Sequence, residues 1–370
     1  MKPCNISTRS FGGMIFKVGL ATSLLLMSQL SLAQDHVITR VSGSLYESNP
    51  ETQVIKLKKF DNLSFTSSSY LGGRLSIHST DSPMTTISYK REFKADSKNQ
   101  AEEFDRYIDF SAEELENEVA ISVETKSMPP WSGTNNSGRV SVEIQIAKND
   151  NLKIDIRTTV FDIEATGPFA SIDISNSSGD ISVTNINSKV RVASENGAVS
   201  VNKCTGPTTI TTSSRPIILS DVNGKLGTIE LRNSGGKIVL NSVRGEITAR
   251  TENASITGDD VRFESGNSIF ATENSDISLD ASAVSGDVNI RDENGKVNFS
   301  LPANTPAQYS LRVEEGGRIY TKSLPMIVEQ ASRTRVVGYS GSRHSKIEID
   351  MAGVGTINLD GKLGSQAADR

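Results

Sequence analysis

Acidic and basic side chains gather between residues 259 and 292, and these are the residues that could do chemistry. Two carboxylates at a suitable separation can cleave a glycosidic bond, and a carboxylate-bound Ca²⁺ beside a basic residue suits a polysaccharide lyase. The acids are Asp259, Asp260, Asp276, Asp280, Asp287 and Asp292, and the bases are Arg262 and Arg291. Aspartate is equally expected in the turns of a β-protein. A carbohydrate-active enzyme of the lyase type therefore stays an alternative function.

Trp131 is the only tryptophan and lies in the longest run of turn residues, from Met128 to Gly138. Because sugar sites use aromatic platforms, Trp131 is a candidate ligand contact, with packing of its own loop as the competing interpretation. Asp259 and Asp260 are the other candidate ligand contacts, since they are adjacent acids where the repeat described below is interrupted.

The remaining reactive residue types form no recognisable catalytic or metal-binding arrangement. The three histidines have no catalytic context, and neither Gly-Gly pair precedes a helix as a phosphate loop would. The residues concerned are His36, His78, His344, Gly235, Gly236, Gly316 and Gly317. Gly338-Tyr339-Ser340-Gly341 lacks the spacing of a nucleophile elbow. We therefore predict a protein that is not an enzyme, with no catalytic, cofactor-binding or metal-binding residues and no cofactor.

Charge excludes a nucleic-acid partner. The net charge is −5, and no cluster of Lys and Arg offers the positive surface that phosphate binding requires. Hydrophobic residues make up 36% of the chain but aromatics only 5%, which favours a thin core of stacked Val, Ile and Leu.

Residues 1–33 have the pattern of an export signal. A basic start with Lys2, Arg9 and Lys17 precedes an uncharged apolar run over residues 18–27, and Ser31 and Ala33 supply the small residues of a cleavage site. An uncleaved anchor is the alternative. Gln34 stands where a lipoprotein needs Cys, and no later stretch is long enough to span a bilayer. The sequence predicts a periplasmic or secreted protein with no transmembrane anchor.

Signal removal leaves a single thiol. Cys4 is lost with the signal, so Cys204 has no partner for an intramolecular disulfide although the compartment is oxidising. Stability must then come from the core.

One motif recurs through the middle of the chain: a polar turn with Asn or Gly, then an apolar, any, apolar strand. The first apolar positions of its copies are residues 181, 199, 217, 238, 256, 277 and 297. The steps of 18, 18, 21, 18, 21 and 20 residues predict an all-β, parallel β-helix (β-solenoid) with 18–21 residues per coil. An antiparallel sandwich is the rival, but hairpins do not require so regular a phase.

The turns contain two further columns. Asn196, Asn253, Asn274 and Asn294 precede the strands by three residues, and stacked amides can hydrogen-bond along the axis. We predict a structural ladder there. Each Asn follows a Glu, and stacked carboxylates repel one another. Either a solvated acidic edge or bound Ca²⁺ at Glu252, Glu273 and Glu293 fits this pattern, and the sequence leaves Ca²⁺ open.

The flanks divide the chain. Residues 34–165 are β-rich but irregular, with one charged helix expected on the outside from Lys98 to Tyr107. Residues 166–363 hold the coils, closing on Gly355-Thr356-Ile357-Asn358-Leu359, and residues 364–370 form a tail.

Three parts of the chain carry a resemblance to a known family. They are Gly179-Asp180-Ile181-Ser182-Val183, the run from Val140 to Ile156 that leads into it, and the closing Leu301-Pro302 with Tyr309 to Leu311. The chain resembles the bacterial putative-adhesin family of exported β-strand repeat proteins of unknown function. The resemblance implies a right-handed β-helix of pectate-lyase-like shape and no catalytic residues. Members often carry Val-Pro where Ala147-Lys148 stand here.

The first interpretation of function is a non-enzymatic exported scaffold. It would be adhesin-like and present a solenoid face to a protein or glycan partner in the cell envelope. The lyase-type enzyme and an envelope-stress signalling partner are the alternatives.

Overall fold

The computed structural model describes residues 37–57 and 59–362, all within one compact unit that begins at Val37. The expected signal over residues 1–33 and the expected tail over residues 364–370 lie outside the described residues. Within the described ranges, no helix combines the length and the apolar content needed to cross a bilayer.

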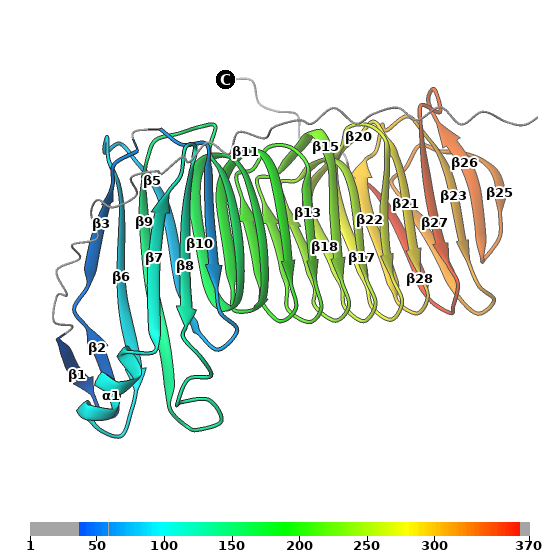
Figure 1. The fold of residues 1–370 in the computed structure, drawn as a ribbon. Coiled ribbons are helices and arrows are strands. Elements are labelled where there is room, and N and C mark those ends of the chain that lie inside the picture. Colours follow the sequence, from blue (N-terminus) through cyan, green and yellow to red (C-terminus); the bar gives the residue numbers. More distant parts are fainter. Residues whose placement is uncertain (1–36, 58, 363–370) are drawn as a thin grey trace, which may run out of the picture. The chain divides into compact units, whose positions relative to one another are not determined.

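The described part of the chain is all-β, as predicted, with a single short helix (Figure 1). The first nine strands are β1 (Ile38–Ser42), β2 (Leu45–Ser48), β3 (Glu51–Ile55), β4 (Asn62–Ser67), β5 (Gly72–Thr80), β6 (Thr85–Lys94), β7 (Ile108–Glu114), β8 (Glu118–Thr125) and β9 (Ser137–Ala147). The regular coils contain β10 (Lys153–Ser178), β11 (Ile181–Ser194), β12 (Val199–Asn202), β13 (Thr208–Thr212), β14 (Ile217–Ser220), β15 (Asn223–Asn233), β16 (Ile238–Asn241), β17 (Arg244–Thr251), β18 (Ile256–Phe263), β19 (Asn267–Thr272), β20 (Ile277–Val284), β21 (Asp287–Asp292) and β22 (Lys296–Pro302). The last six are β23 (Ala307–Val313), β24 (Arg318–Lys322), β25 (Ile327–Ala331), β26 (Arg335–Ser340), β27 (Ser345–Met351) and β28 (Thr356–Lys362).

Successive coils pair in parallel with the predicted step. Each first apolar residue of the repeat is in register with the first apolar residue of the next coil, in the order Ile181, Val199, Ile217, Ile238, Ile256, Ile277 and Val297. All seven are at most 2% exposed. Because side chains alternate along a strand, the apolar, any, apolar motif sends two residues inward from each coil. The coils therefore form a β-solenoid-like stack.

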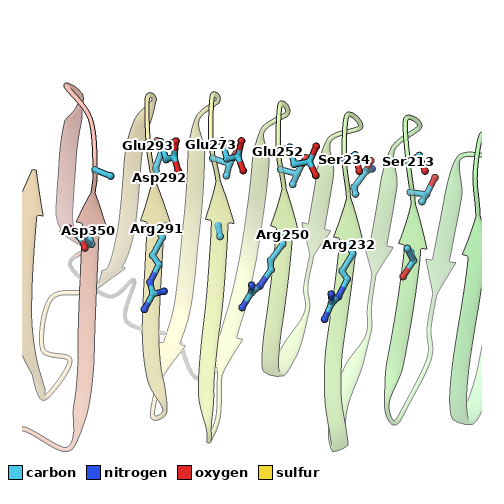
Figure 2. A pocket seen from close by; sticks show the side chains of 17 residues that line it. Ser213, Arg232, Ser234, Arg250, Glu252, Glu273, Arg291, Asp292, Glu293 and Asp350 are labelled. Atoms are coloured by element: carbon cyan, nitrogen blue, oxygen red, sulfur yellow. The ribbon is translucent and has the colours of Figure 1, made fainter. Parts of the chain in front are cut away.

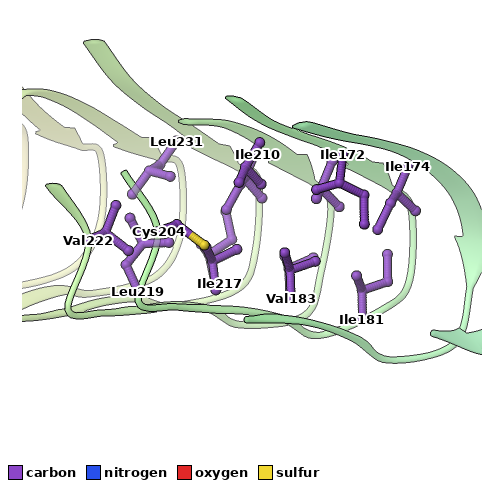
Figure 3. Packing of buried hydrophobic residues seen from close by; sticks show 14 of the residues in the cluster. Ile172, Ile174, Ile181, Val183, Cys204, Ile210, Ile217, Leu219, Val222 and Leu231 are labelled. Carbon is purple, nitrogen blue, oxygen red and sulfur yellow. The ribbon is translucent and has the colours of Figure 1, made fainter. Parts of the chain in front are cut away.

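The second strand of each coil closes the core from the opposite side. Figure 3 shows Ile172 and Ile174 of β10 facing Ile181 and Val183 of β11 across the interior. Cys204 lies in the same interior at 1% exposure, and burial raises the pKa of its thiol to about 11. The narrow interior is filled mainly by aliphatic layers, and the later coils contain an aromatic cluster formed by Phe263, Phe270 and Phe299.

Both ends of the stack depart from sequence order. At the start, β4 and β5 lie between β10 on one side and β8 and β9 on the other. At the finish, β27 and β28 lie between β21 and β22 on one side and β23 and β24 on the other. The closing motif keeps the register of the repeat, since Ile357 pairs with Val297. A coil is therefore intercalated at each end.

Antiparallel strands finish each end. β6 pairs with β9 at the start, and β26 pairs with β23 at the finish. The expected boundary between residues 165 and 166 falls inside β10, and the division into two regions stays a prediction.

The predicted helix is present as α1 (Lys98–Asp105), and Ser97 caps it by accepting a hydrogen bond from the Gln100 N–H. It is not wholly external as predicted. Phe104 is 2% exposed and packs against Phe93 and Trp131, so one face of α1 is part of the core.

The turns carry the predicted amide ladder. The Asn274 side-chain N–H donates to Asn253 Oδ1 at 3.0 Å, and the Asn294 side-chain N–H donates to Asn274 Oδ1 at 3.3 Å. Asn196 belongs to the same column and accepts from Ser214 Oγ at 3.1 Å. The ladder is exposed, and it joins neighbouring coils at their turns.

A second polar column lies inside the same turns. Its members are Asn176, Ser194, Thr212, Asn233, Thr251, Thr272 and Asp292. All are at most 7% exposed. Most use their side chain to satisfy a turn peptide group: Asn233 donates to Arg215 O at 2.7 Å and accepts from the Gly236 N–H at 2.8 Å. The column therefore meets the hydrogen-bonding needs of backbone that is out of reach of water.

Replacing Asn233 by Ala is expected to destabilise the protein by about 2–4 kcal/mol, because a partly buried carbonyl and a buried N–H each lose their partner. Chemical denaturation followed by circular dichroism measures the loss. Asn253→Ala in the exposed ladder is the control and should cost about 1 kcal/mol or less. Equal losses in the two variants would contradict the role assigned to the inner column.

Candidate functional site

An open groove with a volume of about 610 Å³ runs along the coils beside the turns (Figure 2). Six strands contribute to it: β13, β15, β17, β19 and β21 with their following turns, and β27. Each coil gives residues at equivalent positions, so the lining repeats along the stack. Three columns result: an outward one on the strands, the buried polar column, and an outward one at the start of the turns.

The column on the strands is rich in arginine. Arg232 is in register with Arg250, Arg250 with Ala271, Ala271 with Arg291, and Arg291 with Asp350. Arg232 is held by Glu230 in an ion pair at 2.6 Å. The three arginine side chains extend along the strands, away from the turns (Figure 2).

Two of these arginines have no ion pair within the described residues. Arg291 donates only to Asn289 Oδ1 at 3.2 Å, and Arg250 makes no side-chain hydrogen bond or salt bridge there. Between them stands Ala271, whose short side chain leaves space in the groove. The pair therefore offers two exposed guanidinium groups, separated by two coil steps, to an anionic ligand.

The column at the turns is the acidic one predicted from the sequence. The Glu273 N–H donates to Glu252 O at 3.1 Å, and the Asn294 N–H donates to Glu273 O at 2.9 Å, so Glu252, Glu273 and Glu293 occupy equivalent places on successive coils. All three are exposed, and their carboxylates form no ion pair with the arginine column in the described part of the chain. In residues 37–57 and 59–362, no group of three or more His, Cys, Asp or Glu is placed to hold a metal ion.

Asp292 is the unusual member of the buried column. It is 2% exposed, and neither carboxylate oxygen has a partner with hydrogen-bond geometry. Desolvation by burial raises the pKa of Asp292 to about 6, and the charge of Asp276 adds to the rise, while the backbone N–H groups of Asn294 and Glu293 moderate it. Its neighbour Thr272 donates to a turn carbonyl, which an ionised carboxylate cannot do.

Asp259 and Asp260, the two candidate acids of the sequence, have different surroundings in the structure. Asp260 lines a second cavity of about 290 Å³ with Arg262, at 3.8 Å, and accepts from Ser242 Oγ at 3.0 Å. Hydrogen bonding from Ser282 and Ser242 holds the pKa of Asp260 below its usual value. Asp259 is exposed and does not line this cavity. The ligand roles of both residues stay predictions.

Asp260 also has a backbone role. Its φ of 52° continues a column of left-handed residues at equivalent turns, formed by Asn185, Lys203, Asp221 and Ser242. This conformation is costly for most residues but tolerable for Asp and Asn, which favours a structural reason for an acid here.

The side chain of Trp131 is buried in the core and is not exposed at the surface. It is 5% exposed, meets the Phe104 ring edge-on at 5.2 Å, and donates from Nε1 to Tyr70 O at 3.4 Å. Gly138 lies so close that a Cβ there would sit 2.7 Å from the indole. These contacts favour the loop-packing interpretation, and the ligand role of Trp131 stays a prediction.

The other acids of the 259–292 region connect coils. The Asp276 carboxylate accepts from the Lys296 N–H at 2.9 Å, the Asp287 carboxylate accepts from the Lys346 N–H at 2.7 Å, and Asp280 pairs with Lys362. Of the aspartates and arginines singled out between residues 259 and 292, only Arg291 and Asp292 line the large groove, and the predicted glutamate column lines it as well. The arginine column was missed, although Arg232 and Arg250 share the repeat's 18-residue step.

The family model of Toastrack DUF4097 matches residues 73–360. The chain belongs to this family. The match begins inside β5 and ends inside β28, so it covers the regular coils, the groove and the intercalated coil at the finish, but not β4 at the start.

Several solved structures are similar to this chain. A putative adhesin from Parabacteroides distasonis ATCC 8503 is 10% identical, with 84% of this chain and 97% of that chain covered and a TM-score of 0.35. A putative lipid binding protein from the same organism is 14% identical, with 84% and 96% covered and a TM-score of 0.31. A putative cell adhesion protein from Clostridium sporogenes ATCC 15579 is 10% identical, with 85% and 99% covered and a TM-score of 0.21. A comparison with curated proteins found no match.

Replacing Asp292 by Asn is expected to stabilise the protein at pH 7.5 by about 2 kcal/mol. The native carboxyl has a folded pKa of about 6, above its ordinary value of 3.8. Below about pH 4 the carboxyl is protonated in both the folded and the unfolded protein, and the stability of the folded protein is then highest. This stability is lost as the pH rises through 6, because the buried carboxyl must ionise. An Asn at this position could also donate to the turn, as Asn233 does.

Thermal denaturation from pH 4 to pH 8 tests this expectation. The gain of Asp292→Asn over the native protein should be small at pH 4, should grow between about pH 4 and 6, and should level off above about pH 7. Glu195→Gln, an exposed residue of the same turn column whose charge does not act on Asp292, is the control and should show no such trend. A gain that is constant across the range would contradict a buried titrating carboxyl.

Proposed function

We propose that this protein is a non-enzymatic, exported scaffold of the adhesin-like kind, which presents its lateral groove to a protein or glycan partner in the cell envelope. One observation carries the proposal. The outward charged residues of the groove form two parallel columns, with arginines at positions 232, 250 and 291 on the strands and glutamates at positions 252, 273 and 293 at the turns. Like groups therefore repeat along the stack instead of unlike groups converging on one point. Repeated groups suit an extended partner with a repeat of its own, whereas catalysis requires different groups in contact with one reacting bond.

The fold class supports the same proposal. Every pairing among strands β10 to β22 is parallel and joins neighbouring coils, and we place the stack in the parallel β-helix class on that basis. A stack of this kind holds its surface side chains on rigid strands. A partner can then be bound with little loss of conformational freedom in the scaffold.

Asp292 is the observation that favours the lyase or glycosidase alternative. A carboxyl in a groove with a pKa of about 6 resembles a general acid. Yet Asp292 is 2% exposed and occupies the place that Asn or Thr fills on other coils to satisfy the turn. A general acid must reach the proton acceptor within hydrogen-bond distance, which this burial prevents.

Incubation with a panel of acidic polysaccharides separates scaffold from enzyme. We expect binding without cleavage, followed by calorimetry for binding and by ultraviolet absorbance for unsaturated chain ends. The double substitution Arg250→Gln with Arg291→Gln should weaken binding about five- to tenfold, because two exposed charge contacts are lost.

Arg191→Gln is the matched control, since Arg191 is exposed on β11 but does not line the groove. Release of unsaturated ends that Asp292→Asn abolishes would establish the enzyme and overturn the scaffold.

Export has its own test. Expression of the full chain in a bacterial host should give a mature protein that begins at Gln34 and is found in the periplasmic or extracellular fraction. N-terminal mass spectrometry of the purified protein measures this. A membrane-bound product that retains residues 1–33 would support the uncleaved anchor instead.

A further inference from the structure

The groove holds opposite charges that do not neutralise each other. Arg250 and Glu252, and likewise Arg291 and Glu293, stand two residues apart at the end of a strand, but neither pair forms a salt bridge. Two-residue spacing is compatible with pairing elsewhere on the same stack, where Arg157 bonds Asp155 at 2.9 Å. The difference lies in the chain path: β17 and β21 end between the two positions, and the glutamates turn away with the backbone (Figure 2).

We propose that the groove binds a glycan chain that carries a carboxylate and a free amine in each disaccharide repeat, and that this chain lies along the stack of coils. The inference rests on the proposed function, in which the groove is the binding surface, and it names the ligand's chemistry. Carboxylates of the glycan pair with Arg250 and Arg291, and its ammonium groups pair with the glutamate column.

The spacing of the charges favours a polysaccharide. Successive coils are separated by the inter-strand distance of about 4.8 Å, so Arg250 and Arg291, two steps apart with Ala271 between them, are about 10 Å apart. A linked pyranose ring advances a glycan by about one such step, so an acidic group on every second sugar meets both arginines. The amine of the sugar between the two carboxylates then lies at the intermediate coil, beside Glu273, and Glu252 and Glu293 flank it one coil away on either side.

The same spacing disfavours an extended peptide. Side chains on one face of a strand recur at about 6.7 Å, which does not match a column with a step of about 4.8 Å. Nucleic acid is disfavoured by charge, because phosphates would face Glu252, Glu273 and Glu293 across the groove.

The lining also points to a charged rather than a neutral glycan. None of the residues that form the groove is aromatic, so an uncharged sugar ring would find no stacking platform. Arginine and glutamate are the groups that remain for recognition. Exposed pairs of this kind are individually weak, and several acting together along one chain are needed for useful affinity.

Oligosaccharides of N-deacetylated hyaluronan test the proposal, with native hyaluronan of the same length as the matched probe. Both carry one carboxylate per disaccharide, and only the deacetylated chain carries a free amine. Calorimetry at low ionic strength should show about tenfold tighter binding of the deacetylated chain. The Arg250→Gln, Arg291→Gln protein should bind both probes more weakly.

Glu252→Gln, Glu273→Gln and Glu293→Gln together should abolish the preference for the amine while leaving native hyaluronan bound as well or better. Glu273→Gln alone should reduce the preference for the amine. This single variant replaces the triple variant in the test if the triple variant melts at a lower temperature than the native protein. Glu195→Gln is the control, because Glu195 stands in the same column but outside the groove.

The outcomes separate this inference from the proposed function. Equal binding of the two probes, or a preference that the glutamate substitutions leave intact, overturns the ligand assignment. Loss of binding in the arginine variant then still supports a scaffold that uses this groove. Failure of both probes to bind overturns the ligand assignment. Should the polysaccharide panel also show no arginine-dependent binding, the groove is not the binding surface.

Discussion

Each coil from β10 to β22 hydrogen-bonds to the next one, and along the paired strands a residue meets its equivalent one coil later at about 4.8 Å. This constraint gives the stack its stability when equivalent residues attract. Apolar residues bury one another in continuous layers, and amides such as Asn253 and Asn274 bond along the axis. No disulfide is available among the described residues, where Cys204 is the free thiol, so these repeated contacts hold the coils together.

The same constraint also stacks groups that do not attract. A carboxylate column at Glu252, Glu273 and Glu293 is an unfavourable arrangement in isolation, and Asp292 places a titrating group in a column otherwise filled by neutral hydrogen-bonding side chains. Features that cost stability are often retained where they serve function. The unpaired charges of the groove fit this pattern, because a ligand of opposite charge relieves the repulsion that the coils impose.

The regular part of the fold could be read from the sequence because the repeat is local. Apolar positions at a near-constant step specify both the inward face and the register, and the Asn column marks the turns. The order of coils at the two ends could not be read, since β4 and β28 carry the same alternation as any other strand and nothing local encodes their neighbours.

The candidate site was harder to predict, because outward positions have no apolar signal. Arg250 and Glu252 can be recognised as members of charged columns only when the strand register is known, because the register places them beside the equivalent residues of other coils. Trp131 was chosen by residue type, and its burial against Phe104 depends on a helix whose inner face the sequence did not reveal.

The intercalated coil at the finish sets an order of events for a chain that is synthesised from its N-terminus. Residues 303–344 emerge before residues 345–362, yet they pair with β27 and β28 instead of with the coil that precedes them in sequence. The edge formed by β21 and β22 therefore stays unpaired until residues 345–362 have been synthesised. A chain shortened by its final coil would keep that edge open, and open edges recruit strands from other molecules. The coil formed by β27 and β28 thus covers an edge that would otherwise be open to association with other molecules.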